Sequence, residues 1–593
     1  MQQSAPRKAC DLCYNKRIKC DGQKPICSHC VIYKRECTHT AASRKTSARK
    51  QGSNEGEGHL KSRLKDLETR LSQALQNISK LEGLVSELSA SPISLSPVRN
   101  LPGDEAGFFE TRHHASMELP PPSEVLPAVE NYLTTFNSVL PLFHSGALLK
   151  SIHNWYWYPD QRDCVSWAAI NVVLALAYRG NNPVDMFSTK DTAEYLNKAQ
   201  SVLTEVTMRG VNLINVQVLA GLVLLYQGAQ DMGPPTMLVA TALRLAHSLR
   251  LQSRRSSEHL DSSDALQRNR VFWIIYILDR DISMRIKQAP LQQDSDIDLD
   301  LPPEEPDEDE AGFVVSADGR FRLNFFRARV QLARIQGKLY DCLYSVRAQT
   351  RPETRADNMT QIRHMLDDWI SHVPHSFSPS ALSQACSPGM LRYFGILYGT
   401  RLSCLSLVSM AHSWDARWME KLQDYGCRAA TGNAAMPVPL VAPLPEGWET
   451  LVNESREFMK LSMSMEGKDA AFVWITACAY VSGLVCLTAN NMCQPNHGSL
   501  KFDRRLVDMA LLHVEEMVLQ TSHEPLRRIG EACKELVRYD RMAFQEGHRN
   551  DRVLAGQVLS EEVLPFYFVE NGAEHVYGLK EPVTILGPLY ISA

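Results

Sequence analysis

Six cysteines within the first 37 residues place the strongest constraint on this chain. They follow the string C-x2-C-x6-C-x6-C-x2-C-x6-C, which begins at Cys10 and ends at Cys37. The string contains one C-x2-C-x6-C unit and a second copy of it that begins 17 residues later, at Cys27. Two thiolates from a C-x2-C pair can bind one tetrahedral Zn(II) ion from a tight turn. The spacing therefore predicts a small metal-binding module.

The number of cysteines bears on how many metal ions the module binds. Two separate four-thiolate sites need eight sulfurs, but two ions can share six if two thiolates bridge them. The repeat makes the first cysteine of each unit, Cys10 and Cys27, the natural bridging pair. Other hypotheses are three disulfides, a redox-active C-x-x-C pair, or a mononuclear zinc site with His29 or His39. We favour the binuclear cluster, because the N-terminus lacks the apolar segment of a signal peptide and a reducing compartment disfavours disulfides.

The distribution of charge indicates a nucleic-acid partner. The chain of 593 residues has a net charge of −4, which alone suggests no such partner. Residues 1–50, however, hold 12 Lys and Arg against 3 Asp and Glu, a net charge of +9. The remaining 543 residues have a net charge of −13. A basic metal module beside an acidic body favours binding to a polyanion through the module.

The stretch ACDLCYNKRIKCD at 9–21, with Pro25 two residues before Cys27, resembles the fungal binuclear zinc-cluster (Zn2Cys6) transcription factors. The resemblance implies a DNA-binding domain at 6–40 with two structural Zn(II) ions. It implies that one ion is bound by Cys10, Cys13, Cys20 and Cys27, and the other by Cys27, Cys30, Cys37 and Cys10. It also implies a nuclear regulator of RNA polymerase II transcription that binds double-stranded DNA with CGG-type triplets.

Basic side chains within the module are the candidate DNA contacts. A short helix that starts near Cys13 is expected to present Lys16 and Arg17 together, with Lys19 close by. In the resembled family such a helix enters the major groove, where Lys and Arg donate to guanine O6 and N7. The other basic residues are expected to contact phosphates, which gives affinity without sequence information. These phosphate-contact candidates are Arg7, Lys8, Lys24, Lys34 and Arg35.

A heptad pattern follows a polar linker at 41–59. Residues 60–90 carry two apolar series with a spacing of seven: Leu60, Leu67, Ala74, Leu81 and Leu88, and Leu64, Leu71, Ile78 and Val85. Four unbroken heptads predict a coiled coil, and the choice of apolar residues favours two parallel strands. We therefore expect a homodimer through 60–90. The alternative is an amphipathic helix that packs on its own chain.

The rest of the chain is expected to be almost entirely helical. Residues 91–124 form a disordered proline-rich linker by composition. Apolar residues recur at helical spacing in the segments 164–178, 190–209, 213–230, 234–251 and 264–287. The stretches 234–252 and 268–298 resemble the fungal-specific regulatory domain that follows many zinc clusters. We expect an all-α regulatory domain at 125–420 and a mostly helical region at 421–593, so the fold class is mostly α.

Four features of the helical body admit two interpretations each. The uncharged run 471–489 is expected to be a buried core helix rather than a membrane helix. Residues 294–310, with ten Asp and Glu, are expected to form a solvated loop; the alternative is a surface that docks partners or restrains the basic module. Asp279 with Arg280, and His247, are expected to be structural rather than catalytic. The WYWYPD run at 155–160 is expected to pack in the core or an interface rather than line a ligand pocket.

The sequence predicts a regulator and not an enzyme. It contains no glycine-rich phosphate loop, H-E-x-x-H or G-x-S-x-G motif. We expect control of a set of fungal pathway genes, with a secondary-metabolite cluster as one candidate. We also expect a small-molecule or protein effector of the helical domain, and no membrane partner. The alternative function is a zinc-bearing interaction scaffold or enzyme whose helical body carries the activity.

Overall fold

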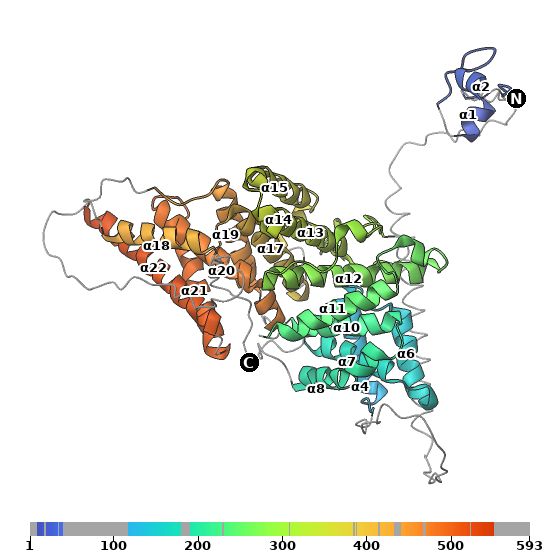
Figure 1. Cartoon of the computed structure of the whole chain (residues 1–593), viewed down its shortest axis with the longest axis horizontal. Coiled ribbons are helices and arrows are strands. Elements are labelled where there is room, and N and C mark those ends of the chain that lie inside the picture. Colours follow the sequence, from blue (N-terminus) through green and yellow to red (C-terminus); the bar gives the residue numbers. More distant parts are fainter. Residues whose placement is uncertain are drawn as a thin grey trace, which may run out of the picture. The chain divides into compact units, whose positions relative to one another are not determined.

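A computed structural model describes the following residues of the chain: 9–16, 19–33, 35–38, 117–179, 190–227, 231–306, 309–382, 386, 388–412, 415–431, 441–465, 470–521 and 524–550. Helices dominate these residues (Figure 1), so the predicted mostly α fold class is confirmed. The chain divides into two compact units, residues 1–111 and residues 112–593. The predicted coiled coil at 60–90 and the linker at 41–59 lie outside the described residues, as does most of the linker at 91–124.

The first half of the larger unit is built around two buried helices. α7 and α10 are apolar on all sides, as expected for helices at the centre of a domain. α7 packs against α4, α8 and α10, and α10 also packs against α11 and α12. The elements are α4 (Pro122–Thr134), α5 (Phe136–Val139), α6 (Ser145–Trp157), η1 (Pro159–Gln161), α7 (Cys164–Tyr178), α8 (Lys190–Ser201), α9 (Leu203–Met208), α10 (Leu213–Tyr226), α11 (Gly233–Ser248), η2 (Arg254–Ser257) and α12 (Ser262–Ile286).

A short hairpin connects the first half of this unit to the second. Strands β1 (Phe313–Val315) and β2 (Arg322–Asn324) pair antiparallel, with Val314 opposite Leu323. The elements around and after the hairpin are η3 (Asp294–Asp296), α13 (Phe325–Leu339), η4 (Tyr340–Tyr344), α14 (Val346–Gln349), η5 (Pro352–Thr354), α15 (Arg355–Ser371), η6 (His375–Phe377), α17 (Pro388–Ser409), α18 (Ala416–Thr431), α19 (Trp448–Ser464), α20 (Ala470–Cys493), α21 (Leu500–Thr521) and α22 (Glu524–Asn550).

Helix α20 is the central element of the second half. It contacts α17, α19, α21 and α22 (Figure 1). The segment Phe472–Cys493 is long and apolar enough to cross a membrane, but 83% of its most apolar window is buried against the rest of the protein. A helix that neighbouring helices cover on several sides needs no lipid, so this placement favours the predicted core helix.

Four of the five predicted helical segments of the first half each correspond to one helix, with differences at their ends. The segment 164–178 coincides with α7, which Asp163 caps by accepting hydrogen bonds from the N–H groups of Val165 and Ser166. The predicted helix 190–209 is instead two helices, α8 and α9, that meet at Val202. The hydroxyl of Ser201, the last residue of α8, bonds to the backbone of the same helix, a local bond that competes with helix continuation.

The aromatic run at 155–160 packs within the domain, as predicted. Trp155 is buried, and the guanidinium of Arg162 lies 5.1 Å from the centre of its ring. The hydroxyl of Tyr156 donates to the carbonyl of Pro120. Tyr158 is half exposed. These contacts connect α6 to the start of α4.

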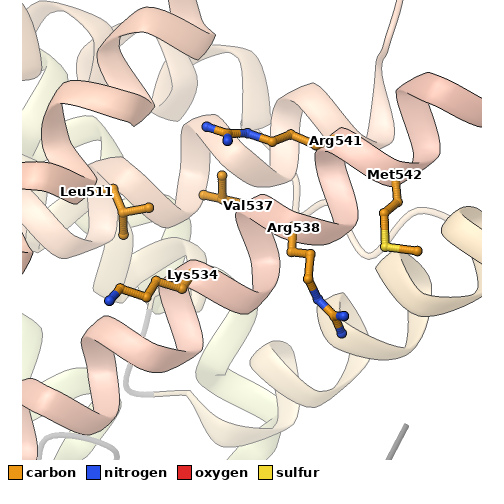
Figure 2. A pocket seen from close by; sticks show the side chains of 6 residues that line it. All are labelled: Leu511, Lys534, Val537, Arg538, Arg541 and Met542. Carbon is orange, nitrogen blue, oxygen red and sulfur yellow. The ribbon is translucent and has the colours of Figure 1, made fainter. Parts of the chain in front are cut away.

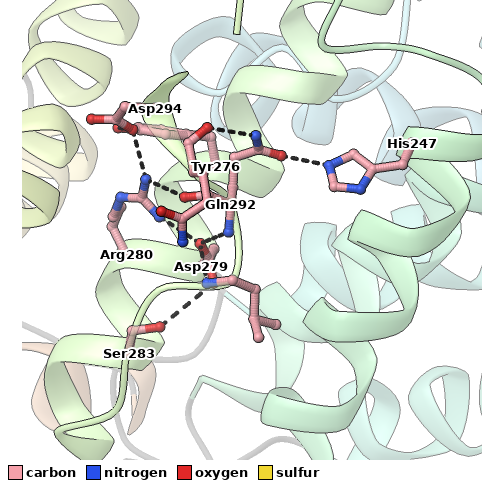
Figure 3. Close-up of polar contacts among 9 residues, drawn as sticks. His247, Tyr276, Asp279, Arg280, Ser283, Gln292 and Asp294 are labelled. Carbon is pink, nitrogen blue, oxygen red and sulfur yellow. Dashed lines mark hydrogen bonds and ion pairs between the residues drawn. The ribbon is translucent and has the colours of Figure 1, made fainter. Parts of the chain in front are cut away.

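Asp279 and Arg280 form a buried polar network in the C-terminal half of α12 (Figure 3). The two side chains are 1% and 2% exposed, and their charged groups lie 2.6 Å apart. The Asp279 carboxylate accepts hydrogen bonds from the backbone N–H groups of Leu291 and Gln292. Burial raises the pKa of Asp279, and these N–H groups and Arg280 offset part of that effect. The network joins α12 to the chain that follows it, so the prediction of a structural role is confirmed.

Arg280 extends this network to the acidic segment, and His247 extends it to α11 (Figure 3). The Arg280 guanidinium donates to the Asp294 carboxylate at 2.7 Å, and the Tyr276 hydroxyl donates to the same oxygen. His247 lies 2.6 Å from the side-chain oxygen of Gln292. These groups belong to one hydrogen-bonded network that joins α11, α12 and the segment after α12, as expected for structural residues.

The acidic segment 294–310 is exposed at all but one of its described acidic residues, as predicted for a solvated loop, but it is also bonded to the helical domain. Six of its acidic side chains bond to the helical domain itself: Asp294 to Arg280, Asp298 to the Arg254 backbone, Asp300 to Arg254, Glu304 to Arg327, Asp309 to Arg270, and Glu310 to Arg322. Composition alone could not show this, because the arginine partners come from other parts of the chain. The segment therefore bonds to residues of η2, α12, β2 and α13.

Candidate metal centre and nucleic-acid interface

Two short helices organise the N-terminal unit. α1 (Asp11–Asn15) begins directly after Cys10, and α2 (Ser28–Ile32) begins directly after Cys27. Each helix carries the second cysteine of its unit at its third position, and the two helices are offset by the same 17 residues as the cysteines. The sequence repeat is therefore also a structural repeat.

The six cysteine sulfurs fall into two groups of four. One group contains Cys10, Cys13, Cys20 and Cys27, and the other contains Cys10, Cys27, Cys30 and Cys37. Within each group, all sulfurs lie within 4.8 Å of one another. The structure has all six as free thiols, since no pair approaches disulfide bonding distance. The two groups share Cys10 and Cys27, the pair that the repeat singles out as bridging.

The spacing of the sulfurs fits tetrahedral zinc. Four sulfurs at about 2.3 Å from one Zn(II) lie about 3.8 Å from one another. The Cys10 sulfur lies 3.6 Å from the sulfurs of Cys27 and Cys30, and the Cys13 sulfur lies 3.7 Å from that of Cys27. The donor set thus has the separation and the chemistry for two zinc ions with four thiolates each.

The local backbone stabilises the two shared sulfurs as thiolates. The N–H of Cys13 lowers the pKa of Cys10, and the N–H of Cys30 lowers the pKa of Cys27. Burial raises the pKa of Cys13 and of Cys30. In each unit, the N–H of the second cysteine therefore bonds to the sulfur of the first cysteine, and that sulfur belongs to both four-sulfur groups.

Two hydrogen-bonded contacts hold the module together around the sulfurs. The N–H of Asp11 donates to the carbonyl of Thr38 at 2.8 Å, which joins the two ends of the module. The Asp21 carboxylate accepts from the N–H of Ser28 at 3.2 Å, at the start of α2. The Ser28 side chain and, to a lesser degree, its backbone N–H lower the pKa of Asp21 by hydrogen bonding, which favours the ionised carboxylate. No pattern in the sequence indicates that Asp21 bonds to the start of the second helix.

The predicted DNA-contact residues are exposed wherever the structure describes them. Their side chains project from the surface of the small unit and include Lys16, Lys19, Lys24 and Arg35. The other predicted contacts, Arg7, Lys8, Arg17 and Lys34, lie outside the described residues. No described candidate is buried, so each can reach a polyanion.

The expected start of the first helix is wrong by two residues. The prediction starts the helix near Cys13 and places Lys16 on it, but α1 begins at Asp11 and ends at Asn15. The earlier start allows the Cys13 N–H to point at the Cys10 sulfur. Lys16 therefore follows directly after α1, although its N–H still donates to the carbonyl of Leu12.

Tyr33 is a neighbour of Lys16 that the sequence did not reveal. The Lys16 ammonium lies 4.2 Å from the centre of the Tyr33 ring, a cation–π contact between the two units of the repeat. Tyr33 is 47% exposed at the end of α2. An aromatic residue three positions after Cys30 is the only pattern that could have suggested this contact.

The larger unit has a groove between α21 and α22 (Figure 2). Its volume is about 230 Å³, and its lining combines apolar and basic side chains: Leu511, Lys534, Val537, Arg538, Arg541 and Met542. The three cations already pair with Glu515, Glu535 and Asp508. The groove therefore has no unpaired cation among its lining residues to recognise an anionic ligand.

Two family models match the chain. The fungal Zn(2)-Cys(6) binuclear cluster domain matches residues 8–47, and the fungal specific transcription factor domain matches residues 129–371. The first match contains the whole sulfur cluster. The second contains α7, α10 and α12, together with the polar network of Asp279 and Arg280.

Curated relatives match most of the chain. An ABC-transporter-regulating transcription factor of Aspergillus oryzae is 26% identical over 91% of this chain and 74% of its own length. A protein of the same name in Aspergillus fumigatus is 25% identical with the same coverage. The fusaridione A cluster transcription factor of Fusarium heterosporum is 25% identical over 71% of this chain and 77% of its own length. No solved structure matches.

Proposed function

We propose that this chain, a fungal transcription factor of the Zn(2)-Cys(6) binuclear cluster family, binds duplex DNA with CGG-type triplets and regulates pathway genes in the nucleus. One observation carries the proposal: two four-sulfur groups share Cys10 and Cys27 in a small unit that exposes Lys16 and Lys19. A metal-stabilised scaffold with exposed cations is suited to a polyanionic partner.

The two zinc ions have a structural role in this proposal. Cys10, Cys13, Cys20 and Cys27 would bind one ion, and Cys27, Cys30, Cys37 and Cys10 the other. When bound, the ions supply the cohesion that a unit of this size cannot obtain from apolar burial. Four thiolates fill each site and leave no position for water, so we propose no catalytic step.

The basic side chains would make two kinds of contact with DNA. Lys16, Arg17 and Lys19 would donate to base edges in the major groove, where guanine offers two acceptors. The remaining cations would contact phosphates: Arg7, Lys8, Lys24, Lys34 and Arg35. Phosphate contacts set the register on the duplex, whereas base contacts select the triplet.

We propose that the protein acts as a homodimer through residues 60–90. The heptad pattern supports this arrangement, and the linker 41–59 would set how far apart the two zinc units can bind. A flexible linker of this length spans ~25 Å in root-mean-square terms. Two CGG-type triplets within one or two helical turns are therefore within reach of one dimer.

The names of the relatives support a choice of target genes. Two relatives that cover 91% of this chain regulate ABC transporters, as their names state. The Fusarium heterosporum relative regulates the fusaridione A cluster. We propose that the targets include transporter genes or a secondary-metabolite cluster, and that an effector of the helical domain controls the response.

The base-contact role of Lys16 is tested by fluorescence anisotropy with full-length protein. The ratio of affinities for a CGG duplex and for a duplex with a changed triplet is measured. Lys16→Ala should lower this ratio by about tenfold, the effect of losing one good contact to a base edge. Lys150→Ala, which removes an exposed lysine of the helical unit, is the matched control. An unchanged ratio in Lys16→Ala would exclude Lys16 from base recognition.

A further inference from the structure

Helix α21 carries an exposed stripe that is largely apolar. Its side chains recur at spacings of three and four residues along the helix: Phe502, Arg505, Met509, Leu512, Glu516 and Leu519. Such spacing brings all six onto one face of the helix, over a length of about 25 Å. The four apolar side chains are between 41% and 83% exposed. A continuous apolar stripe on the surface of a folded domain is typical of an interaction site.

The surroundings of the stripe show that packing within this unit does not account for it. The opposite face of α21 is buried in the domain: Asp503, Leu506, Val507, Ala510, Val514 and Met517. The neighbouring helix α22 exposes mostly cations among its described residues: Arg527, Arg528, Lys534, Arg538, Arg541 and Met542. A charged outer face is usual for a helix at the surface of a domain. The apolar outer face of α21 is therefore an exception in this part of the protein.

The stripe is complementary to itself when two copies meet in opposite directions. In a pair related by a two-fold axis, residue i of one copy faces residue j of the other, and residue j faces residue i. An axis between Met509 and Leu512 places each of these residues opposite the other in the second copy. The same axis places Phe502 opposite Leu519. It also places Arg505 opposite Glu516, so every apolar residue faces an apolar residue and each charge faces its opposite.

The order of the two charges favours an antiparallel pair over a parallel one. A parallel pair in register places Arg505 opposite Arg505 and Glu516 opposite Glu516, and like charges across an interface are unfavourable. The antiparallel pair forms two Arg–Glu contacts instead, one on each side of the axis. Both side chains are accessible for these contacts. Arg505 is exposed, and the side chain of Glu516 is 65% exposed although it lies 3.7 Å from Nδ1 of His513 on the same helix.

We propose that the helical unit pairs with a second copy of this chain through the exposed face of α21, antiparallel about a two-fold axis between Met509 and Leu512. The contact is separate from the homodimer proposed above through 60–90 and does not depend on it. Burial of the apolar residues supplies the attraction, and the contacts of Arg505 with Glu516 set the direction and the register. A contact through one helix is smaller than most stable dimer interfaces, so the pairing is reversible.

Photo-crosslinking in the full-length, zinc-loaded protein tests the contact. A benzophenone side chain is introduced at position 512, denaturing electrophoresis separates linked dimers from monomers, and mass spectrometry identifies the linked residues. Position 512 should link to the region of Met509 in a second chain. Arg505→Glu should lower the yield of linked dimer by about tenfold or more, because it places two acidic groups opposite each other at both contacts. Arg505→Glu combined with Glu516→Arg should restore the yield, since opposite charges face each other again.

Two further variants serve as controls. Arg334→Glu reverses the charge of an exposed arginine on α13 and should form linked dimers as the wild type does. Leu71→Asp combined with Ile78→Asp places charges at two heptad positions of 60–90 and should retain the link. This second variant separates the two dimer proposals, because it removes the pairing through 60–90 and leaves α21 unchanged.

Three results would overturn the proposal. The first is that no linked dimer forms, or that position 512 links only within its own chain, for example to residues 551–593. The second is that Arg505→Glu keeps the full yield. The third is loss of the link in the variant with Leu71→Asp and Ile78→Asp, which would mean that α21 pairs only when 60–90 holds two chains together.

Discussion

Cys27 and Cys20 should differ sharply in what their loss does to zinc content. Both are single sulfurs of the N-terminal cluster, but Cys27 belongs to both four-sulfur groups and Cys20 to one. Cys20→Ala leaves one complete group of four thiolates. Cys27→Ala leaves two groups of three, so neither ion keeps a full set of protein ligands.

The size of the effect follows from the number of sulfurs that each ion loses. Structural zinc binds with an apparent free energy of about 10–16 kcal/mol, or roughly 2.5–4 kcal/mol for each of four thiolates. Removing one thiolate should therefore weaken a site by roughly 10²- to 10³-fold. Cys20→Ala applies this loss to one ion, and Cys27→Ala applies it to both.

The assay measures zinc bound per chain against a competing chelator, at a concentration where the wild type keeps two ions. Cys20→Ala should keep one ion and Cys27→Ala none. Cys37→Ala, the equivalent change in the second unit, should match Cys20→Ala. Equal losses from Cys20→Ala and Cys27→Ala would refute the bridging role of Cys27.

Three further predictions concern stability and assembly. Asp279→Ala should destabilise the helical unit by about 3–5 kcal/mol in urea denaturation, because it breaks a buried ion pair and leaves two backbone N–H groups unpaired; Asp296→Ala, at an exposed position nearby, should change stability by less than about 0.5 kcal/mol. Burial lowers the pKa of His412 to about 3 in the folded protein, whereas the pKa of a histidine in the unfolded chain is about 6.5. Below pH 6.5 the unfolded state therefore binds a proton that the folded state does not, and the stability of the folded state falls as the pH drops. Between pH 7 and 5, His412→Asn should lose about 2 kcal/mol less stability than the wild type. Deletion of 60–90 should weaken binding to a two-triplet duplex far more than binding to a single triplet in gel-shift titrations, and equal losses would count against the dimer.

Local patterns in the sequence predicted much of the metal centre. The 17-residue repeat of the cysteines pointed to Cys10 and Cys27 as the shared pair, and the structure groups the sulfurs in this way. The spacing of thiols along the chain encodes this grouping directly, because a C-x2-C pair closes within one turn. The start of α1 was misplaced by two residues, because a backbone N–H bonded to a sulfur leaves no trace in the sequence.

Contacts between distant segments could not be predicted in the same way. The helical pattern predicted α7 and α12. It did not predict that the acidic segment 294–310 bonds to arginines of other elements. Arg285, in the last turn of α12, shows the same limit. A basic residue in the last turn of a helix is ordinarily an exposed complement to the helix dipole. Only packing against the rest of the domain buries its guanidinium.

Selection of bound sequences from a pool of random duplexes tests the central claim most directly. Full-length, zinc-loaded protein is used, with a parallel selection after zinc is removed by a chelator. The account predicts enrichment of duplexes with CGG triplets, at a preferred spacing, in the zinc-loaded sample alone. Enrichment of a motif without CGG, or the same enrichment without zinc, would contradict it.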